Sequence, residues 1–428
     1  MSLTPDSTPT RREFIRTSSA TIGTAAAFTI GASAHAKSNK KLKVGLVGCG
    51  GRGGGAIVQA ISADPDTEVY ALGDAFDDQV ESTLKKLKSS KLGDRVNVDE
   101  DHKFVGFDAY KGVVKSCDVV VLATPPNFRP EHLAYCVEKG KHTFVEKPIA
   151  VDPVGIRSVM ETCKVAAKKN INVVSGLCYR YQFAKQDLVK RIHDGEIGDI
   201  VNMQTTYNTG ALWHKGRPES WTEIEYQMRN WLYFDWLSGD HINEQHIHSL
   251  DKLGWVMGNE YPVKVTASGG RIARIDPKYG NIYDHFNSVY EWENGVKGFS
   301  SCRQLDQTST DVSDHIFGTK GTAHMQRHQI DFRNGKKWAH EQSGPDDMYQ
   351  NEHDEFFKAI RSGDTINNGE YMCNSTLMAV MARMSAYTGK TVTREQALDS
   401  KLDLSPAKYE WGDHAVNPIA RPGVTEFI

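Results

Sequence analysis

The sequence predicts an α/β protein with two domains, and three observations lead to this prediction. At 428 residues, the chain exceeds the roughly 250–300 residues at which a single hydrophobic core stops growing. Apolar strands and helical patterns alternate from residue 44 to about residue 175, which indicates a parallel sheet covered by helices on both faces. From residue 200 to residue 333, alternating strands joined by Asn-Gly turns indicate a mostly antiparallel sheet.

The first 36 residues differ from the rest of the chain. Residues 10–16, TRREFIR, carry a pair of arginines, and an Ala-, Thr- and Gly-rich run follows to Ala34. Ala34-His35-Ala36 offers the small residues of a cleavage site. This stretch resembles a bacterial twin-arginine export signal, which predicts a periplasmic protein, or a membrane-tethered one if the signal is not cleaved. The alternative is an uncleaved N-terminus with two chance arginines.

The expected helices and strands follow from apolar periodicity and turn residues. In the first domain, strands are expected at residues 44–47, 69–73, 118–123, 142–145 and 171–175, and helices near 54–62, 76–88, 107–115, 130–139 and 153–169. In the second, a helix at 183–194 leads into strands at 200–207, 262–274, 284–293, 296–303, 314–318, 322–327 and 329–333. Helices near 350–361 and 370–388 come last.

The composition argues against several classes of protein. A net charge of −3 with 25% charged residues leaves no basic excess for binding nucleic acid. No second long apolar run follows the N-terminal stretch, so no transmembrane span is expected in the mature chain. The seven cysteines are scattered and form no Cys-x-x-Cys pair, which argues against a zinc ribbon and predicts few or no disulfides.

A glycine-rich turn, Gly48-Cys49-Gly50-Gly51-Arg52-Gly53, directly follows the first expected strand. Gly48 permits the tight turn, Gly50 lets the backbone approach a pyrophosphate, and Gly53 lets helix and strand pack closely. The next helix presents free N–H groups to the phosphates. Strand, glycines, helix, second strand and terminal acid follow the order of a Rossmann dinucleotide-binding domain, with a plain glycine-rich turn as the alternative. We expect this domain at residues 37–178, after a signal at 1–36, and a second domain at 179–428.

Asp74 ends the second strand, where a carboxylate can accept hydrogen bonds from both hydroxyls of the adenosine ribose. The residues that follow, Ala75-Phe76-Asp77-Asp78, include no arginine, so a ribose 2′-phosphate would meet negative charge. NAD is therefore predicted over NADP. The alternative, in which Asp74 only caps the next helix, is compatible with either NAD or NADP.

Two further loops follow strands that end at the same edge of the sheet, where ligands of such sheets bind. The turn Thr124-Pro125-Pro126-Asn127 is expected to bring backbone toward the nicotinamide side of a dinucleotide. Its prolines make it a rigid turn whether or not it contacts the cofactor. Glu146-Lys147-Pro148 places an ammonium over the cleft, where it can polarise a substrate hydroxyl or carbonyl; a solvated surface lysine is the alternative. The cofactor-binding residues expected from all these loops are Gly48, Cys49, Gly50, Gly51, Arg52, Gly53, Asp74, Thr124, Pro125, Asn127, Glu146 and Lys147.

Together, the motifs GCGGRG, GD at the second strand end, ATPPN, EKP and the later RY…GEIGDI resemble the glucose–fructose oxidoreductase/inositol dehydrogenase family, Gfo/Idh/MocA. The resemblance covers roughly residues 41 to 387. It implies a Rossmann domain followed by a substrate-binding α+β domain with a large, mostly antiparallel open-faced sheet, a nicotinamide cofactor, and a sugar or polyol substrate. Open-faced sheets of this type often pair face to face, so a homo-oligomer is expected.

The family also places an Asp-x-x-x-His motif on a helix of the second domain, and the match here is Glu244 and His248, with glutamate where aspartate is usual. A spacing of four puts both side chains on one helical face, so that the carboxylate can orient the imidazole and His248 can act as general base. A helix-surface pair is the alternative. His241, Glu244 and His248 also have a spacing that suits zinc, but HExxH is absent and no metal is predicted.

Aromatic residues are dense between Tyr207 and Trp236 and are interleaved with basic side chains. Flat rings with charged donors suit stacking on a sugar ring, and packing of a long loop onto the sheet is an equal alternative. The candidate substrate-binding residues are Arg180, Tyr181, Tyr207, Trp213, Arg229 and Trp231.

These motifs predict an exported NAD-dependent oxidoreductase that transfers a hydride between nicotinamide and a sugar, polyol or glycoside. Lys147 would stabilise the alkoxide while His248 accepts the hydroxyl proton. Because the periplasm has no obvious pool of free NAD, the cofactor is expected to be tightly bound. A glycosidase that oxidises its sugar transiently, eliminates a substituent and restores the hydride is the second hypothesis. A non-catalytic NAD- or sugar-binding protein is the third.

Overall fold

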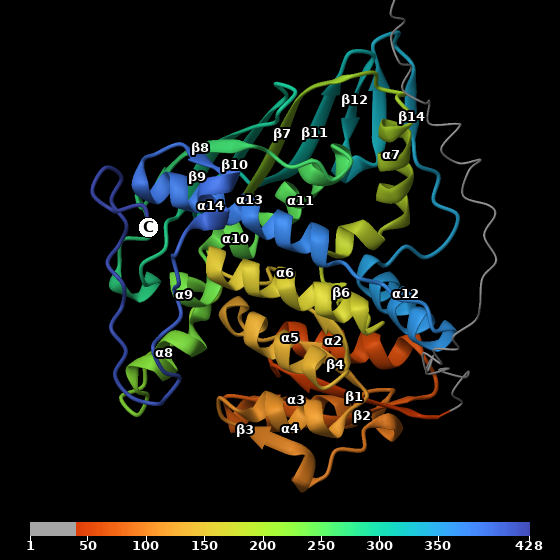
Figure 1. The fold of residues 1–428 in the computed structure, drawn as a ribbon, viewed down its shortest axis with the longest axis vertical. Coiled ribbons are helices and arrows are strands. Elements are labelled where there is room, and N and C mark those ends of the chain that lie inside the picture. The colour runs from red at the N-terminus through yellow and green to blue at the C-terminus, as the bar shows by residue number, and fades with distance from the viewer. Residues whose placement is uncertain (1–39) are drawn as a thin grey trace, which may run out of the picture. The chain divides into compact units, whose positions relative to one another are not determined.

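The first part of the chain forms a six-stranded parallel sheet in the order β3-β2-β1-β4-β5-β6 (Figure 1). The computed structural model describes residues 40–428, so the twin-arginine pattern lies outside the described residues. The strands are β1 (Leu42–Val47), β2 (Thr67–Asp74), β3 (Lys103–Val105), β4 (Val119–Leu122), β5 (His142–Val145) and β6 (Val173–Ser175). The helices between them are α2 (Gly51–Ala63), α3 (Asp77–Lys88), α4 (Ala109–Ser116), α5 (Arg129–Glu138) and α6 (Pro153–Lys168).

The strands of this sheet are apolar without alternation because helices cover both faces. In β4 all of Val119–Leu122 is buried, and α2 buries Ala56, Ile57, Ala60 and Ile61 against the sheet. The predicted alternation of strands and helices is confirmed. The short strand β3 was not predicted, because its three residues are only half-buried or exposed and carry no apolar run.

The second part of the chain forms a nine-stranded sheet in the order β14-β13-β12-β11-β7-β10-β9-β8-β15. The long strand β7 (Ile200–Thr209) lies at its centre, antiparallel to β11 and parallel to β10, so the predicted mostly antiparallel sheet is confirmed. The other strands are β8 (Lys264–Gly270), β9 (His285–Glu291), β10 (Lys297–Gln304), β11 (Asp311–Gly318), β12 (Gly321–His324), β13 (Gln329–Phe332), β14 (Lys337–Ala339) and β15 (Val392–Thr393).

Helices cover one face of this sheet and leave the other open. The covering contacts come from α10 (His241–Glu244), α11 (Ile247–Val256), α13 (Gly369–Thr388) and α14 (Arg394–Asp399). The remaining helices of this part are α7 (Phe183–His193), α8 (Glu223–Arg229), α9 (Asp235–Ser238) and α12 (Met348–Ser362). Burial alternates along β10, where Gly298, Ser300 and Cys302 face the helices and Phe299 is exposed. This alternation is the pattern of a sheet with one covered face.

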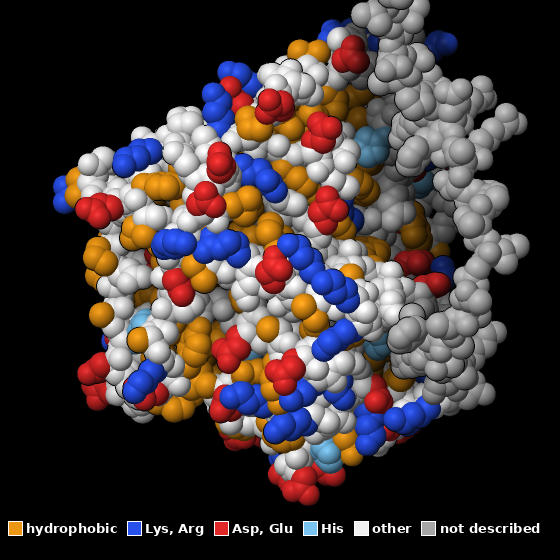
Figure 2. Space-filling view, in the orientation of Figure 1, with side chains coloured by type: hydrophobic (Ala, Val, Ile, Leu, Met, Phe, Trp, Pro, Cys, Tyr) orange, Lys and Arg blue, Asp and Glu red, His pale blue; other side chains and the backbone are white. Residues whose placement is uncertain are grey.

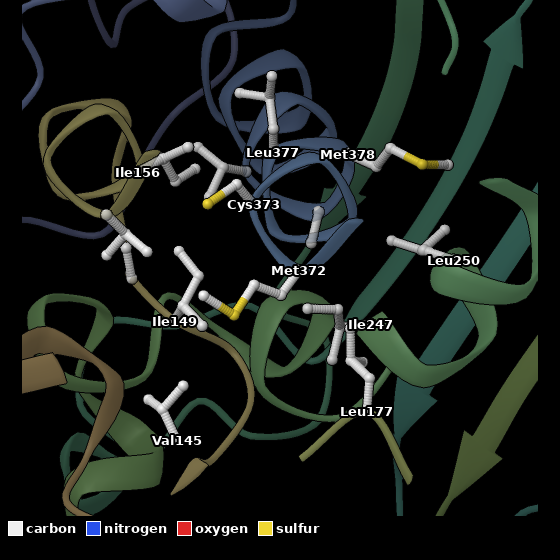
Figure 3. Packing of buried hydrophobic residues seen from close by; sticks show 14 of the residues in the cluster. Val145, Ile149, Ile156, Leu177, Ile247, Leu250, Met372, Cys373, Leu377 and Met378 are labelled. Carbon is white, nitrogen blue, oxygen red and sulfur yellow. The ribbon is translucent and has the colours of Figure 1, made fainter. Parts of the chain in front are cut away.

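The C-terminal helices tie the two sheets together. Helix α12 packs against α2, and α13 packs against both α6 and α11. Figure 3 shows Met372 and Cys373 of α13 among residues of both parts, with Ile149 and Ile156 on one side and Ile247 and Leu250 on the other. The described residues, 40–428, accordingly lie in one compact unit.

The remaining chain after α14 runs down past α8 and α9 (Figure 1). All seven cysteines lie within the described residues and are free and buried. No described helix combines the length and apolar character needed to cross a membrane. On the face in Figure 2, acidic and basic side chains are interspersed, in keeping with the small net charge.

Candidate active site

The glycine turn between β1 and α2 depends on two close backbone contacts. Gly48 has φ +95°, and a Cβ there would lie 2.6 Å from the backbone carbon of Ala123. At Gly53 a Cβ would lie 1.9 Å from the carbonyl oxygen of Gly48, so only glycine lets the helix approach the turn. Gly50 and Gly51 have no atom within 4 Å of such a Cβ, which leaves their backbone open to a ligand. This is a cradle that fits a pyrophosphate.

The predicted cofactor residues line one cavity of about 400 Å³ at the carboxyl edge of the first sheet. Of the predicted set, the cavity is lined by Gly48, Gly50, Gly51, Arg52, Gly53, Asp74, Thr124 and Pro125. Four members lie outside the lining. Cys49 is buried behind the turn, Asn127 accepts a hydrogen bond of 2.6 Å from the Tyr409 hydroxyl, and Glu146 and Lys147 lie in the loop after β5. The loops after β1, β2 and β4 therefore line one cavity of the kind that binds a dinucleotide.

Asp74 joins the glycine turn to the end of β2. Its carboxylate accepts hydrogen bonds from the backbone N–H groups of Cys49, at 2.6 Å, and of Phe76, at 3.0 Å. Burial raises the pKa of Asp74, and these bonds act in the opposite direction. The side chain also lines the cavity, where ribose hydroxyls would meet it.

Arg52 connects the glycine turn to the loop after β5. Its guanidinium donates to Glu146 and, at 3.2 Å, to Glu352 of α12, which is fully buried. The second oxygen of Glu146 accepts the backbone N–H of Lys147 at 3.2 Å. Burial, followed by the charge of Glu146, raises the pKa of Glu352 well above its usual range, whereas the charge of Arg52 lowers it. Glu146 thus lies between the cofactor turn and the predicted catalytic lysine.

Lys147 reaches across to the second part of the chain. Its ammonium donates to the backbone oxygen of Glu244 at 2.6 Å and to the Glu244 carboxylate at 3.2 Å. Both side chains are about 15% exposed, so the pair is partly shielded from water. The structure therefore brings these two predicted residues together.

The predicted single helix through Glu244 and His248 is wrong. Helix α10 ends at Glu244 and α11 begins at Ile247. The break arises because Gln245 accepts a hydrogen bond of 2.9 Å from Gln304, while His246 bonds Ser300 at 2.6 Å, which draws both side chains into the sheet. Glu244 consequently accepts a hydrogen bond from Lys147. The Nδ1 atom of His248 has no hydrogen-bond partner among the described residues.

His248 is half-buried beside the Lys147–Glu244 pair. Its ring meets the Tyr179 ring edge-on, with 5.3 Å between centroids. Burial, followed by the positive charges of Lys147 and Lys252, lowers the pKa of His248 well below its usual range. The imidazole is therefore neutral at pH 7 and free to accept a proton, as a general base must be.

Four residues of this region were not predicted from the sequence: Tyr179, Lys185, Lys252 and Asp314. The ammonium groups of Lys185 and Lys252 lie 4.6 Å and 4.4 Å from the centre of the Tyr179 ring. Lys252 forms a fully buried ion pair with Asp314 of β11. Burial and the charge of Lys252 lower the pKa of Lys185 to about 7. The sequence carries one signal for Lys252: it comes four residues after His248, and this spacing places two residues on the same face of a helix.

Three candidate substrate residues lie in different surroundings. Tyr207 of β7 is half-buried, and burial, followed by the nearby Tyr179 and Glu244, raises its pKa. Arg180 donates through Nε to both carboxylate oxygens of Asp251, at 2.9 and 3.0 Å, and is buried. Tyr181 donates to Asn368 at 2.9 Å. Tyr207 thus borders the Lys147–Glu244–His248 group, whereas Arg180 and Tyr181 have protein partners that favour a structural role.

The other three candidates, Trp213, Arg229 and Trp231, line the cavity beside Asp74 and Phe76. They therefore lie at the adenosine end of the dinucleotide space rather than beside Lys147. Deeper in the same aromatic segment, Tyr233 and Trp236 are buried and pack the segment in place, as the packing alternative expects, while stacking on a sugar ring stays a prediction.

The histidines considered for zinc do not converge. His241 bonds Asp240 at 2.9 Å and contacts the Cys302 sulfur at 3.5 Å, while Glu244 is bonded to Lys147. In the part of the chain that the structure describes, no group of three or more His, Cys, Asp or Glu side chains is arranged to hold a metal ion.

The fold and the cavity define an oxidoreductase with an NAD-binding Rossmann domain, and comparison with protein families agrees. Residues 42–175 match the oxidoreductase family with an NAD-binding Rossmann fold, and residues 186–324 match the GFO/IDH/MocA C-terminal domain. These segments make up more than half of the chain. The protein belongs to the Gfo/Idh/MocA family.

Several curated proteins are similar in sequence. An uncharacterized oxidoreductase of Streptococcus pneumoniae is 27% identical over 257 residues, which are 59% of this chain and 60% of the relative. A 2,7-anhydro-N-acetylneuraminate hydratase of Escherichia coli is 28% identical over 201 residues, 46% of this chain and 50% of the relative. An inositol 2-dehydrogenase of Rhizobium meliloti is 25% identical over 282 residues, 65% and 74% respectively. The chain thus spans only 50% to 60% of the first two relatives.

Solved structures share the fold. A scyllo-inositol dehydrogenase from Lactobacillus casei, with bound NAD(H) and scyllo-inositol, has a TM-score of 0.63 at 20% identity and covers 83% of this chain and 100% of its own. An aldose-aldose oxidoreductase from Caulobacter crescentus has a TM-score of 0.64 at 18% identity, with coverage of 83% and 100%.

Proposed function

We propose that this protein is an NAD-dependent oxidoreductase that transfers a hydride between nicotinamide and a hydroxyl or keto group of a sugar, polyol or glycoside. The observation that carries the proposal is that Lys147, Glu244 and His248 lie together and are joined, through Glu146 and Arg52, to the cavity built by the glycine turn and Asp74. The relationship to an inositol 2-dehydrogenase supports a polyol or sugar substrate.

The side chains suggest a division of tasks. When bound, NAD⁺ supplies the acceptor for the hydride of the substrate carbinol. Lys147 holds the substrate oxygen and stabilises its developing negative charge. Glu244 fixes the position of the Lys147 ammonium through its backbone oxygen and its carboxylate. Neutral His248 accepts the hydroxyl proton, and its low pKa keeps it unprotonated near neutral pH.

A panel of inositols, free sugars and glycosides tests this function. Reduced nicotinamide would be followed by its absorbance while products are separated and identified. The expected result is oxidation of at least one polyol or sugar by the wild-type protein, and none by a Lys147→Ala variant. Equal product formation by the two proteins would contradict the proposed role of Lys147, and no turnover or release from any member would contradict the function.

A second candidate uses the same residues in a reaction without net oxidation. The curated relatives include the hydratase of an anhydro sugar and a glycosyl hydrolase family 109 protein of Porphyromonas gingivalis, 26% identical over 168 residues. Transient oxidation at a carbinol makes the neighbouring C–H bond acidic, so that a substituent can be eliminated before the hydride returns. Release of an aglycone with no lasting change in nicotinamide absorbance would favour this reaction over net oxidation.

We also propose that the protein is exported through the twin-arginine route. The pair Arg11-Arg12 and the small residues that follow support this proposal. Cell fractionation of the wild type and of a variant with both arginines replaced by lysine would test it. Export predicts periplasmic wild-type protein and cytoplasmic variant, and an identical distribution of the two would contradict it.

The open face of the second sheet supports a homo-oligomer. Val201 and Phe299 expose 52% and 45% of their surface on neighbouring strands, and an exposed apolar patch on a sheet marks a candidate contact. Light scattering after size-exclusion chromatography would measure the mass. A Phe299→Glu variant is expected to shift it toward the monomer, and a wild-type monomer would contradict the proposal.

A further inference from the structure

Two histidines face each other on neighbouring strands of the second sheet. His315 of β11 and His324 of β12 are directly opposite in the antiparallel register. Their Nδ1 atoms lie 2.9 Å apart, and the two rings are nearly perpendicular, with 82° between their planes. Figure 1 shows β11 and β12 in the upper part of the view, away from the first sheet, and the residues that line the dinucleotide cavity come from other elements.

Both imidazoles lie on the open face of this sheet. Asp314 and Ile316 of β11 are buried on the side of the helices, so His315 between them points to the opposite face. Ala323 of β12 is buried in the same way, and the His324 side chain beside it is 18% exposed. Solvent therefore reaches the two rings, although the neighbouring strands partly shield them.

Asp331 of β13 determines which nitrogen of His324 carries the hydrogen. Its carboxylate lies 3.1 Å from Nε2 of His324, and because a carboxylate only accepts, Nε2 is the donor. Neutral His324 then presents an unprotonated Nδ1 toward His315. Gln329 donates to the other oxygen of Asp331 at 2.6 Å, and the Lys337 ammonium lies 3.6 Å from that oxygen. A fixed carboxylate behind an imidazole is the usual support of a metal-binding histidine.

The distance between the two Nδ1 atoms suits two bonds to one metal ion. Metal–nitrogen bonds of about 2.0–2.1 Å that meet at a right angle place the nitrogens about 2.9 Å apart, whereas the tetrahedral angle separates them by about 3.3 Å. The separation in this structure is 2.9 Å. Square-planar and tetragonal sites with nitrogen ligands are typical of Cu²⁺ and Ni²⁺, whereas Zn²⁺ prefers a tetrahedron. The spacing therefore favours Cu²⁺ or Ni²⁺.

We propose that His315 and His324 chelate one Cu²⁺ or Ni²⁺ ion through their Nδ1 atoms, with Asp331 holding His324 in place. Without metal, the bond between the two Nδ1 atoms needs a hydrogen on Nδ1 of His315. On metal binding this proton passes to Nε2 of His315 through solvent, so that both Nδ1 atoms offer a lone pair. Water fills the remaining coordination positions, because no third His, Cys, Asp or Glu of the described chain is arranged to complete the site.

A metal ion at this place would join strands that form one side of the second sheet. Strands β14, β13 and β12 follow one another outward from β11, and β14 is the edge strand. An ion that binds both histidines binds the folded sheet only, so it stabilises the folded protein. The site lies outside the dinucleotide cavity, and the inference is therefore independent of the proposed function.

Calorimetric titration of the metal-free protein, without a histidine tag, with CuCl₂ and NiCl₂ tests the site. One ion per chain is expected at the site. His315→Gln and His324→Gln should each weaken this binding by at least about 100-fold, because a single imidazole cannot chelate. Asp331→Asn should weaken it by about tenfold through loss of the supporting carboxylate. His285→Gln is the matched control, since His285 also bonds a carboxylate but pairs with Gly270 and Arg303 rather than with a second histidine.

Two further measurements do not depend on how well the variants fold. Electron paramagnetic resonance of the Cu²⁺-loaded wild type is expected to show couplings from two imidazole nitrogens. Thermal unfolding of the wild type should shift to higher temperature with added metal and return with a chelator, whereas His315→Gln should not respond. Equal affinity of the wild type and both histidine variants would overturn the inference, as would a wild type that binds neither ion or shows a single imidazole on Cu²⁺.

Discussion

At the cofactor end of the site, the geometry depends on backbone that only glycine can form, whereas at the chemical end it depends on charged side chains brought together by burial. Gly48 and Gly53 permit a turn that any Cβ would block. Lys147, Glu244 and His248 come from two parts of the chain, and burial together with the charge of Lys147 lowers the pKa of His248. The first end therefore tolerates little change in shape, and the second little change in charge.

The largest effect is expected at the chemical end. Replacing His248 by glutamine removes the proton acceptor while keeping a polar side chain of similar length, so kcat should fall by about 10²–10⁴-fold. Because the pKa of His248 is lowered, the base stays neutral and the wild-type rate should not fall from this group between pH 8 and pH 6. Steady-state kinetics across that range would measure both.

The control for this variant is His193→Gln on α7, an exposed histidine that lies outside the site. It should retain wild-type kinetics. A wild-type rate that declines with an apparent pKa near 6.5 would show that the imidazole is not held neutral, and it would contradict the account of this end.

A steric change should damage the cofactor end. Gly53→Ala would place a methyl group 1.9 Å from the Gly48 oxygen, so the turn must open. The expected loss is about 3 kcal/mol in unfolding free energy, together with loss of dinucleotide binding. Gly54→Ala is the matched control, since no atom lies within 4 Å and alanine favours the helix by up to about 1 kcal/mol. Urea unfolding and NADH titration would compare them, and equal stability of the two variants would contradict the steric argument.

A third prediction concerns Lys185, whose folded pKa of about 7 lies below its usual value of 10.5. Between these values the unfolded chain binds a proton that the folded protein lacks, so stability rises with pH. The wild type should gain about 1 kcal/mol per pH unit relative to Lys185→Met above pH 7. Urea unfolding at pH 6, 7, 8 and 9 would give the slope. Parallel curves for the two proteins would mean that Lys185 stays charged when folded.

The smallest effect is expected for Glu352, which accepts a hydrogen bond from Arg52 at 3.2 Å and whose pKa is raised by burial. Glu352→Gln keeps the shape of the side chain and an oxygen acceptor for Arg52, so kcat should remain within about threefold of wild type. Glu146→Gln should cost more, because Glu146 accepts hydrogen bonds from both Arg52 and the backbone N–H of Lys147. Kinetics of both variants would rank them, and a larger loss in Glu352→Gln would contradict this order.

The sequence was informative where the determinants are local. The glycine turn, Asp74 and Lys147 each lie at or just after the end of a strand, so pattern and position were enough to predict a nucleotide site at one edge of the sheet. The first sheet and the antiparallel character of the second followed from apolar periodicity in the same way.

The sequence was uninformative where partners come from distant elements. The break between α10 and α11 depends on Ser300 and Gln304 of β10, about 60 residues later, and no local pattern reports such bonds. Arg229 was assigned to the substrate because its neighbours are aromatic, yet its carboxylate partner, Asp78, lies 151 residues earlier. Glu352 contacts Arg52 across 300 residues, so only the fold reveals that pair.

One measurement tests the separation of binding from chemistry most directly. NADH affinity and single-turnover hydride transfer would be measured on the wild type, on Lys147→Ala, and on Lys139→Ala, a partly exposed lysine at the end of α5. The account predicts that Lys147→Ala binds NADH within about threefold of wild type but loses hydride transfer by at least about 10²-fold, while Lys139→Ala behaves as wild type. Hydride transfer that survives in Lys147→Ala, or that is lost only in proportion to NADH binding, would contradict it.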